Sequence, residues 1–373
     1  MTSIPMPNRR HVRELDWLML AVVALCCLGL ATAVSVSGPT ETTGSLGAMK
    51  SQGTKLLVGL VGFLFFTITP LATIRRLALP AFFVGAMLCY LPRLVGDPVN
   101  GAYRWLQVAG YSFQPVEFAR FLMVIAIASV LARVGTGVNT FVRGFLPSMG
   151  CAFLLCGGLF LQPDHGNALI AFALAACMSL CAGVRFLHFA PFAAAGLIGF
   201  IALATRHDYV VGRLTDFLDV KPGTQVGQAM VAIAAGGPFG VGIGQGWMKM
   251  GYVPEAQNDF VFAVVAEELG YTGSLFVLAL YTVIGVVGYR LVLQTRDPFH
   301  RFCIFGFTLM ICMQAAMNLM VVSGCAPAKG IDLPFVSSGG TSILFCLSAI
   351  GIIGNAARSD AAAPAFNLQP GRL

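Results

Sequence analysis

Stretches of about 20 apolar residues recur along almost the whole chain, and no other feature limits its folding as strongly. A hydrocarbon core of about 30 Å requires roughly 20 such residues per helix. Only 10% of the residues are charged, against about 25% in soluble domains. The sequence therefore predicts an all-α polytopic membrane protein of about ten transmembrane helices. The ten windows lie at about 17–37, 54–71, 77–95, 115–132, 144–162, 167–184, 186–205, 258–289, 302–325 and 338–357.

Prolines interrupt two of these windows, at Pro80 and Pro92 in the third and at Pro191 in the seventh. The eighth window is unusually long, which predicts a helix that is tilted or extends beyond the bilayer. Residues 206–257, between the seventh and eighth windows, form a long stretch that is not apolar and is too short for an independent domain. Its Gly- and Ala-rich part, 224–244, is compatible with a re-entrant segment.

Basic residues fall mainly on one side of the membrane when the N-terminus is placed inside. Alternate connections on that side hold 13 basic and four acidic residues, whereas the rest of the chain holds ten basic and 12 acidic ones. This asymmetry follows the positive-inside rule. Within a single integral membrane domain, 1–373, it places the segment 1–16 and the tail 358–373 in the cytoplasm and the loop 206–257 outside. The net charge of +7 thus reflects topology and contact with membrane lipid, and no nucleic-acid partner is expected.

The eleven cysteines lie almost all inside apolar windows, and they show neither metal-ligand spacing nor a disulfide framework. We interpret them as small apolar residues of helices. No small-residue cleavage site clearly follows the first apolar run, so this run is predicted to be a retained helix.

Ionisable residues inside apolar windows are the strongest functional candidates, because placing them in a span is costly. The stretch 100–120, NGAYRWLQVAGYSFQPVEFAR, contains Arg104, Glu117 and Arg120. Pro115 suits the first turn of a helix, so Glu117 and Arg120 lie three residues apart on one face and can pair. The aromatic residues of this stretch are more simply interpreted as an interfacial belt.

Acidic residues also surround the start of the eighth window. Glu255 and Asp259 precede the long apolar run, and Glu267 and Glu268 lie about two turns deeper. Asn258 or Asp259 can simply cap the helix N-terminus. Capping does not explain Glu267 and Glu268, which stand inside the span and need partners.

Two further polar turns are predicted on the outer side. In the first, 162–166, Asp164 is expected to bond its own backbone, and His165 is as readily a solvated turn residue as a site residue. The second carries Lys329 and Asp332 in a Pro- and Gly-rich loop before a Ser-Ser-Gly-Gly-Thr turn. Small hydroxyl residues at that helix N-terminus fit an anion site or a plain N-cap.

Together these residues predict a polar site on the outer side of a helical bundle, with both carboxylates and cations. Carboxylates act as general bases, and Arg and Lys hold phosphate or pyrophosphate. Two classes of protein fit this site, namely a membrane enzyme acting on a lipid-linked anionic substrate and a transporter. An ion channel fits less well, since no helix carries a regular ring of charges.

Four motifs, in order and at the expected helix ends, resemble those of the SEDS family of cell-wall glycosyltransferases, the RodA and FtsW group. They are NGAYRWL with SFQPVEFAR, the QPDHG turn, AAGGPFGVGIGQGWMKMGYVPEAQNDFVFAVVAEELG and NLMVVSGCAPAKGIDLPFVSSGGTS. The resemblance covers nearly the whole chain from about residue 55 and implies ten transmembrane helices. The Ala-Lys-Gly run at 328–330 weakly favours the FtsW-like division branch over the RodA-like elongation branch.

The resemblance implies polymerisation of lipid II, a disaccharide-pentapeptide carried on undecaprenyl pyrophosphate, outside the bacterial cytoplasmic membrane. The family's essential acid falls on Asp259, which would deprotonate the 4-hydroxyl group of the acceptor GlcNAc for attack on the anomeric carbon of the donor MurNAc. A divalent cation, Mg²⁺ or Mn²⁺, can assist at the pyrophosphate, although the sequence shows no set of metal ligands. The expected partners are a class B penicillin-binding protein acting as transpeptidase and other divisome or elongation proteins. Expected substrate-binding residues are Arg104, Glu117, Arg120, Arg213, Lys249, Glu255 and Lys329.

The chain departs from the family pattern near the acid. Gln257 and Asn258 replace a His-Thr pair, Ser338 replaces a tyrosine, and Asp332 adds an acid where neutral residues are common. Two alternatives therefore stay open, a flippase for lipid-linked precursors and a catalytically silent scaffold for a transpeptidase. The ionisable residues in the spans cluster toward the outer half, which favours a one-sided active site over a flippase.

Overall fold

Helices make up nearly all of the structure. The computed structural model describes residues 9–37, 44–96, 103–108, 111–192, 194, 196, 223–247, 257–327 and 329–362. Within these ranges eight helical segments are long and apolar enough to cross a membrane, and one further apolar helix is shorter. The protein is therefore a polytopic helical membrane protein, as predicted. All eleven cysteines are free.

Nine helices form the bundle in the described ranges. They are α1 (Arg9–Val36), α2 (Gly44–Ile68), α3 (Leu71–Leu88), α5 (Pro115–Val134), α6 (Leu146–Leu161), α7 (His165–Cys181), α11 (Val261–Gln294), α12 (Pro298–Val322) and α13 (Gly340–Ala362). The connections contain α4 (Pro92–Val95), the strands β1 (Leu106–Val108) and β2 (Tyr111–Phe113), the short helices η1 (Gly135–Asn139), η2 (Phe141–Phe145) and η3 (Phe186–His188), and α10 (Gln225–Gly236). Most of the predicted span 186–205 lies outside the described residues.

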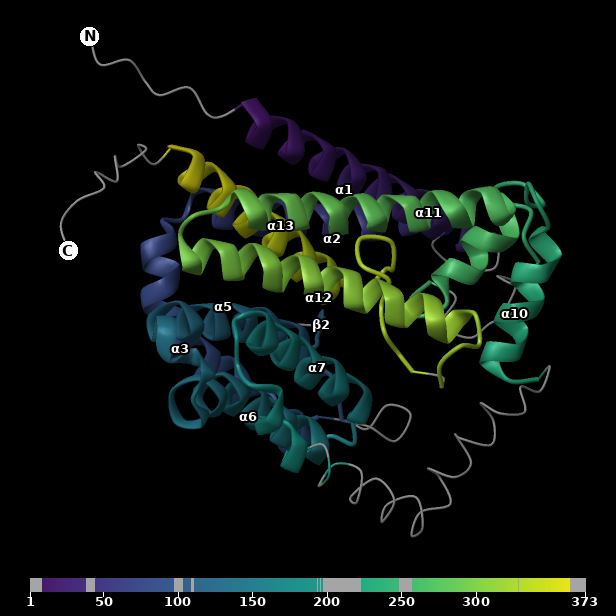
Figure 1. Ribbon diagram of the computed structural model, residues 1–373. Coiled ribbons are helices and arrows are strands. Elements are labelled where there is room, and N and C mark those ends of the chain that lie inside the picture. The colour runs from purple at the N-terminus through teal and green to yellow at the C-terminus, as the bar shows by residue number, and fades with distance from the viewer. Residues whose placement is uncertain are drawn as a thin grey trace.

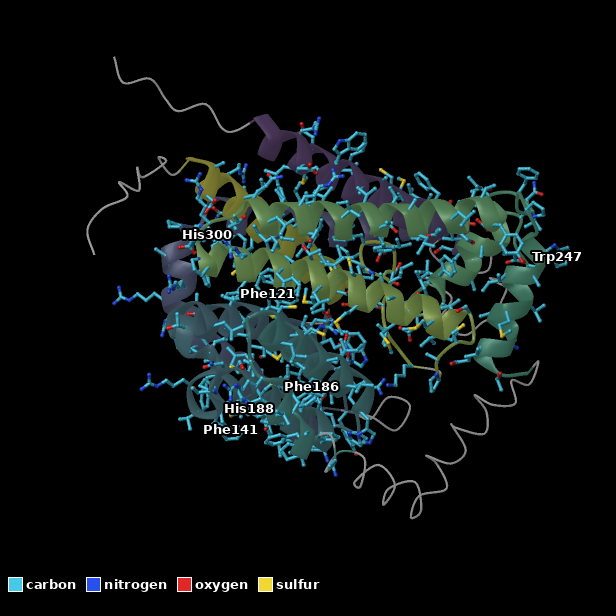
Figure 2. The ribbon with its side chains drawn as sticks, viewed as in Figure 1. Phe121, Phe141, Phe186, His188, Trp247 and His300 are labelled. Atoms are coloured by element: carbon cyan, nitrogen blue, oxygen red, sulfur yellow. The ribbon has the colours of Figure 1, made fainter. Side chains whose placement is uncertain are left out.

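The helices pack into one bundle (Figure 1), in which α5 contacts α3, α6, α7, α12 and α13, and α12 contacts α5, α7, α11 and α13. Helix α1 lies along α11, α2 along α13, and α3 against α5. Phe121 of α5 is fully buried at the centre of the bundle (Figure 2). Its ring lies 5.0 Å from those of Phe66 and Phe307 and 5.4 Å from that of Phe345, measured between centroids. These contacts join α2, α5, α12 and α13 around one aromatic cluster.

Glycines let α2 and α13 approach closely. A Cβ added at Gly59 would lie 2.6 Å from Leu347 Cδ1, and one added at Gly351 would lie 2.5 Å from the carbonyl oxygen of Phe63. Small residues at such crossings are typical of helix pairs in membranes, where close van der Waals packing drives association. The two helices are thus fixed against each other beneath the loop that precedes α13.

The third predicted span, 77–95, lies inside the observed candidate span Leu71–Val95, which begins earlier than predicted. The helix begins at Leu71, continues through Pro80 and ends at Leu88, whereas the apolar window suggested 77–95. A short turn separates the end of α3 at Leu88 from α4, which begins at Pro92, and Leu91 before that proline keeps helical angles (φ −62°, ψ −43°). Pro115 does occupy the first turn of α5, as predicted. The short hairpin β1–β2 pairs Leu106 with Phe113, which adds two strands to a fold predicted to be all helical.

Helix α11 is interrupted in its first third by Gly270, whose φ of 68° and ψ of −161° are not helical. The segment 237–242, which follows α10, inserts at this kink and takes over backbone hydrogen bonds there. Gly242 N donates to Glu268 O at 3.1 Å, and Tyr271 N donates to Gly237 O at 2.9 Å. Backbone groups at membrane depth must be satisfied by protein, so this inserted segment is what permits the long predicted helix to bend.

The two ends of the bundle can be distinguished by the residues that lie there, and one of them carries arginines. At one end Arg75, near the start of α3, lies over the ring of Phe299 at the start of α12, and Arg290 pairs with Glu14 at 3.3 Å. His300 marks this end in Figure 2, and Trp247 marks the opposite end near α10. The first turn of α1 and the last turn of α13 both lie at the His300 end (Figure 1).

Candidate active site

Asp259 stands just outside helix α11, at the Trp247 end of the bundle. The helix begins at Val261, and Phe260 occupies its N-cap position without a side-chain capping bond. The alternative in which Asn258 or Asp259 takes the N-cap position is therefore not the arrangement seen. Hydrogen bonds from other segments of the chain hold the backbone before the helix instead.

Three consecutive carbonyl groups around Asp259 each accept a hydrogen bond from another segment. Two donors come from the loop before α13, and the third comes from α12. The bonds are Ser338 N to Gln257 O at 3.0 Å, Ser337 Oγ to Asn258 O at 2.6 Å and Asn318 Nδ2 to Asp259 O at 2.7 Å. Each net bond contributes about 1 kcal/mol, so the path of the chain through Asp259 is fixed independently of its side chain.

Two amides of α12 position the loop before α13, which we call the 329–339 loop. Asn318 also donates to Ile331 O at 2.6 Å, and Gln314 donates to Asp332 O at 3.1 Å. Gln314 and Asn318 are buried and lie one turn apart, so they face the same side of α12. One helix face therefore holds both the loop and the backbone of Asp259.

The carboxylate of Asp259 and the guanidinium of Arg104 border the same glycine. A Cβ added at Gly330 would lie 2.8 Å from Asp259 Oδ2 and 3.7 Å from Arg104 Nη1. Arg104 Nε lies 3.3 Å from Asp164 Oδ2, and the Arg104 side chain keeps 29% of its surface exposed. The structure therefore brings a predicted base and a predicted cation together, with part of the cation accessible.

Asp164 links Arg104 to the start of α7. It is the N-cap residue of that helix and accepts a hydrogen bond from the backbone of Asn167, so the predicted bond to its own backbone is confirmed. The Asn167 amide also donates to Asp164 at 2.8 Å. Its oxygen lies 3.5 Å from Arg120 Nη1. Polar contacts thus run from the exposed Arg104 into the bundle.

Glu117 and Arg120 form the buried end of this path. The predicted pair exists: Arg120 Nη2 donates to Glu117 Oε1 and, at 2.9 Å, to Gln314 Oε1. Arg120 is only 1% exposed. A buried cation requires a counter-charge and hydrogen-bond acceptors, and Glu117, Gln314 and Asn167 supply them. Because Gln314 also holds the 329–339 loop, the ion pair is connected to the backbone around Asp259.

Lys329 lies beside the N-terminus of α7. A Cβ added at Gly166 would lie 2.9 Å from Lys329 Cδ and 3.4 Å from its Cε. Gly166 and Asp164 belong to the same turn, and Asp164 contacts Arg104. Two of the five predicted cations, Arg104 and Lys329, are therefore gathered around this turn and the adjacent Asp259.

The two deeper acids have structural partners. Glu267 accepts a hydrogen bond from the backbone of Trp247 at 2.8 Å, and Glu268 accepts one from Ser35 of α1 at 2.5 Å. Both glutamates are buried. They tie α11 to α1 and to the segment that inserts at Gly270, which meets the expectation that they need partners inside the span.

Three predicted substrate-binding residues, Arg213, Lys249 and Glu255, lie outside the described residues. Within the described part of the chain, no three His, Cys, Asp or Glu side chains gather as metal ligands. The residues present there do not form a ligand set for the expected Mg²⁺ or Mn²⁺, and the cation stays a prediction.

Comparison with known proteins decides the family. A family model described as "Cell cycle protein", covering FtsW, RodA and SpoVE, matches residues 16–362. The chain belongs to the FtsW/RodA/SpoVE family. It is 33% identical over 348 residues to a probable peptidoglycan glycosyltransferase FtsW of Trichlorobacter lovleyi, covering 91% of each chain. It is 36% identical over 269 residues to the stage V sporulation protein E of Bacillus subtilis, covering 71% of this chain and 74% of that protein.

Solved structures of the FtsW/RodA/SpoVE family share the fold. A peptidoglycan synthase complex that coordinates polymerization and crosslinking aligns with a TM-score of 0.78 at 25% identity, over 92% of this chain and 97% of the other. The rod shape determining protein RodA of Thermus thermophilus aligns with a TM-score of 0.67 at 25% identity, over 92% and 96%. The sequence-based assignment to the SEDS family is confirmed.

Sequence analysis did not predict several residues that build the candidate site. Gln314 and Asn318 are the clearest, because they are polar residues four apart inside an apolar window and an intramembrane polar residue signals a partner. Lys55 of α2, which donates to Ser338 O at 2.7 Å, carried a similar signal. Asp164 was noticed as a turn residue, but its pairing with Arg104 joins segments that no local pattern connects.

Proposed function

We propose that this chain is a peptidoglycan glycosyltransferase that polymerises lipid II, in cell division or cell-shape maintenance. The observation that carries the proposal is the placement of Asp259. Its carboxylate borders Gly330 together with Arg104, and its backbone is fixed by three interelement hydrogen bonds. Several relatives in the family are named as probable peptidoglycan glycosyltransferases.

In the proposed reaction Asp259 acts as the general base. Its carboxylate takes the proton of the acceptor sugar's 4-hydroxyl group, and the oxygen forms a bond to the anomeric carbon of the donor. The bond between that carbon and the pyrophosphate oxygen breaks, and the electron pair leaves with undecaprenyl pyrophosphate. A positioned base contributes typically 10²–10⁴-fold to such a step.

Positive charge near the leaving group is the second requirement, because pyrophosphate gains charge as the bond breaks. Arg104 and Lys329 supply it from either side of the turn that contains Asp164 and Gly166. We assign Arg213, Lys249 and Glu255 to substrate binding on the family resemblance. Side chains of the chain itself fill the base and cation roles, and a divalent cation, if bound, would add positive charge at the pyrophosphate.

Glu117 and Arg120 take a positioning role in this proposal. Their burial leaves little surface for a large polar substrate, whereas their contact with Gln314 connects them to the 329–339 loop. Their contribution is to keep that loop, and thereby Asp259, in place.

The proposed orientation puts the site on the outer face of the bacterial cytoplasmic membrane and both termini in the cytoplasm. The His300 end of the bundle, away from Asp259, contains Arg75 and Arg290. The first turn of α1 and the last turn of α13 also lie at this end. This distribution agrees with the positive-inside rule. A transpeptidase of the penicillin-binding class is the proposed partner, since a structural relative is a synthase complex that joins polymerization to crosslinking.

The test is polymerisation of labelled lipid II by the purified full chain, comparing the wild type with Asp259→Ala. The proposal expects glycan strands from the wild type and none from the variant. Equal polymer from both proteins contradicts the role of Asp259. No polymer from either, with the transpeptidase present, favours the silent scaffold. Movement of lipid II across vesicle membranes without polymer favours the flippase.

A further inference from the structure

A groove of about 250 Å³ lies between helices α1 and α11, which run side by side along the bundle (Figure 1). Its apolar walls are Trp17 of α1 and Val283, Val286 and Val287 of α11. Trp17 is 52% exposed and Val286 is 43% exposed. Apolar side chains exposed on membrane-spanning helices face lipid, so the groove opens toward the acyl chains of the bilayer.

Glu14 and Arg290 form the polar end of the groove. Arg290 Nη1 lies 3.3 Å from Glu14 Oε1, and the Arg290 side chain is 54% exposed whereas that of Glu14 is 5% exposed. The second carboxylate oxygen of Glu14, Oε2, is buried and has no hydrogen-bond partner among the described residues. A buried carboxylate oxygen without a donor is costly. The ion pair therefore leaves an exposed cation beside an acceptor that still needs a donor.

The order of these residues along α11 matches the polarity of a phospholipid. Val283 lies two turns from Arg290, about 10 Å along the helix axis at 1.5 Å per residue. The charged pair lies at the His300 end of the bundle, and the valines extend from it toward the middle of the membrane. Trp17 lies near the pair on α1, and tryptophan favours the level of the lipid headgroups. A lipid that enters with its headgroup at the pair thus places an acyl chain along the valines.

The size of the groove excludes larger occupants. Pockets for drug-sized ligands measure about 300–1,000 Å³, and an α-helix with its side chains is about 10–12 Å wide. The groove, at about 250 Å³, is smaller than such a pocket and fits a segment of one acyl chain. The chain gains little by leaving the bilayer, since both surroundings are apolar. Any preference among lipids therefore comes from the headgroup.

The charged pair calls for a headgroup that carries both charges. A phosphate accepts hydrogen bonds from a guanidinium group, and a primary ammonium group can donate to the free oxygen of Glu14. The choline headgroup has no N–H to donate. A glycerol headgroup has hydroxyl donors, but it brings only negative charge to a pair that Glu14 already makes neutral.

We propose that this groove binds a phospholipid whose headgroup ends in a primary ammonium group, as in phosphatidylethanolamine. Its phosphate binds Arg290, its ammonium group donates to Glu14, and one acyl chain lies along Val283 and Val286. In the orientation proposed above, the lipid belongs to the cytoplasmic leaflet. The groove lies at the opposite end of the bundle from Asp259, so this site is separate from the candidate active site.

The experiment is native mass spectrometry of the purified full chain, released from detergent micelles after titration with dioleoyl lipids. Three headgroups are compared, namely ethanolamine, choline and glycerol. We expect the first ethanolamine lipid to bind about tenfold more tightly than the choline lipid, the fold-change supplied by one hydrogen bond to a charged group.

Two variants locate the lipid, and each has a matched control on α3. Val286→Trp fills the groove and should abolish the tight ethanolamine site, whereas Val84→Trp, at a valine that is 57% exposed, should keep it. Arg290→Gln removes the cation and should weaken binding of the ethanolamine lipid about tenfold. Arg76→Gln, at an exposed arginine, should leave the binding unchanged.

Equal affinity of the wild type for ethanolamine and choline lipids overturns the proposal, as does an ethanolamine site that persists in Val286→Trp. Tighter binding of the glycerol lipid overturns the role given to the ammonium group. A dimer mass that is lost in Val286→Trp shows that a second copy of the chain covers the groove, and this result also overturns the proposal. If one variant does not fold, the other decides. Binding is measured without polymerisation, so either result leaves the proposed function to its own test.

Discussion

Removal of Glu117 tests the claim that a buried ion pair supports the site. In Glu117→Ala the Arg120 guanidinium keeps only the amide oxygens of Gln314 and Asn167 as partners, at 2.9 and 3.5 Å. Arg120 is 1% exposed, so surface water does not replace the lost carboxylate. Loss of one partner of a buried ion pair costs about 3–5 kcal/mol. This is a large fraction of the 5–15 kcal/mol by which proteins are typically stable.

The measurement is equilibrium unfolding of the purified protein in mixed micelles with increasing SDS. The double variant Glu117→Ala with Arg120→Met removes both charges and is expected to be more stable than the single variant, because no unpaired cation remains. Asp16→Ala, an exposed acid on α1, serves as control and should change stability by less than about 0.5 kcal/mol. The reasoning is refuted if Glu117→Ala lowers the free energy of unfolding by less than about 1 kcal/mol. It is also refuted if the loss of stability in the double variant equals the sum of the losses in Glu117→Ala and Arg120→Met alone.

Three further outcomes follow from the structure. Asn318→Leu leaves the carbonyls of Asp259 and Ile331 without their donor, and we expect about 1–3 kcal/mol lower stability per unsatisfied group and a lower kcat for polymerisation; a normal kcat contradicts this role. Gly240→Ala places a side chain at φ +82° against the backbone of Glu268, so a fall in thermal stability is expected, and unchanged melting would contradict the inserted segment. Arg104→Gln should raise the KM for lipid II more than it lowers kcat, since the guanidinium is assigned to the anionic carrier; steady-state kinetics that show the reverse assign it to the chemical step.

Hydropathy predicted most of the architecture because each span had to be apolar over about 20 residues. It placed only the start of the third span too late, since apolarity alone does not reveal that the helix starts at Leu71 and tolerates Pro80. The bend at Gly270 also escaped prediction. Its cause is a segment some thirty residues earlier in the chain, and no local pattern records that insertion.

In the candidate site, too, local contacts could be predicted from the sequence and contacts between distant segments could not. The pairing of Glu117 with Arg120 could be read from their spacing on one helix, and the structure confirms it. The bonds that fix Gln257–Asp259 join residues 59 to 81 positions apart, so spacing could not indicate them. Lys55 was visible in the sequence as a charge at the start of an apolar window, but its bond to the carbonyl oxygen of Ser338 depends on how α2 packs against α13.

The central claim is that Asp259 performs chemistry and does not merely maintain the fold. The most direct measurement compares Asp259→Asn with the wild type for both lipid II binding and polymerisation in one preparation. We predict binding within about twofold and a loss of polymerisation of at least about 100-fold, the contribution expected of a general base. Polymerisation by Asp259→Asn at a rate near that of the wild type, with equal binding, would contradict the account.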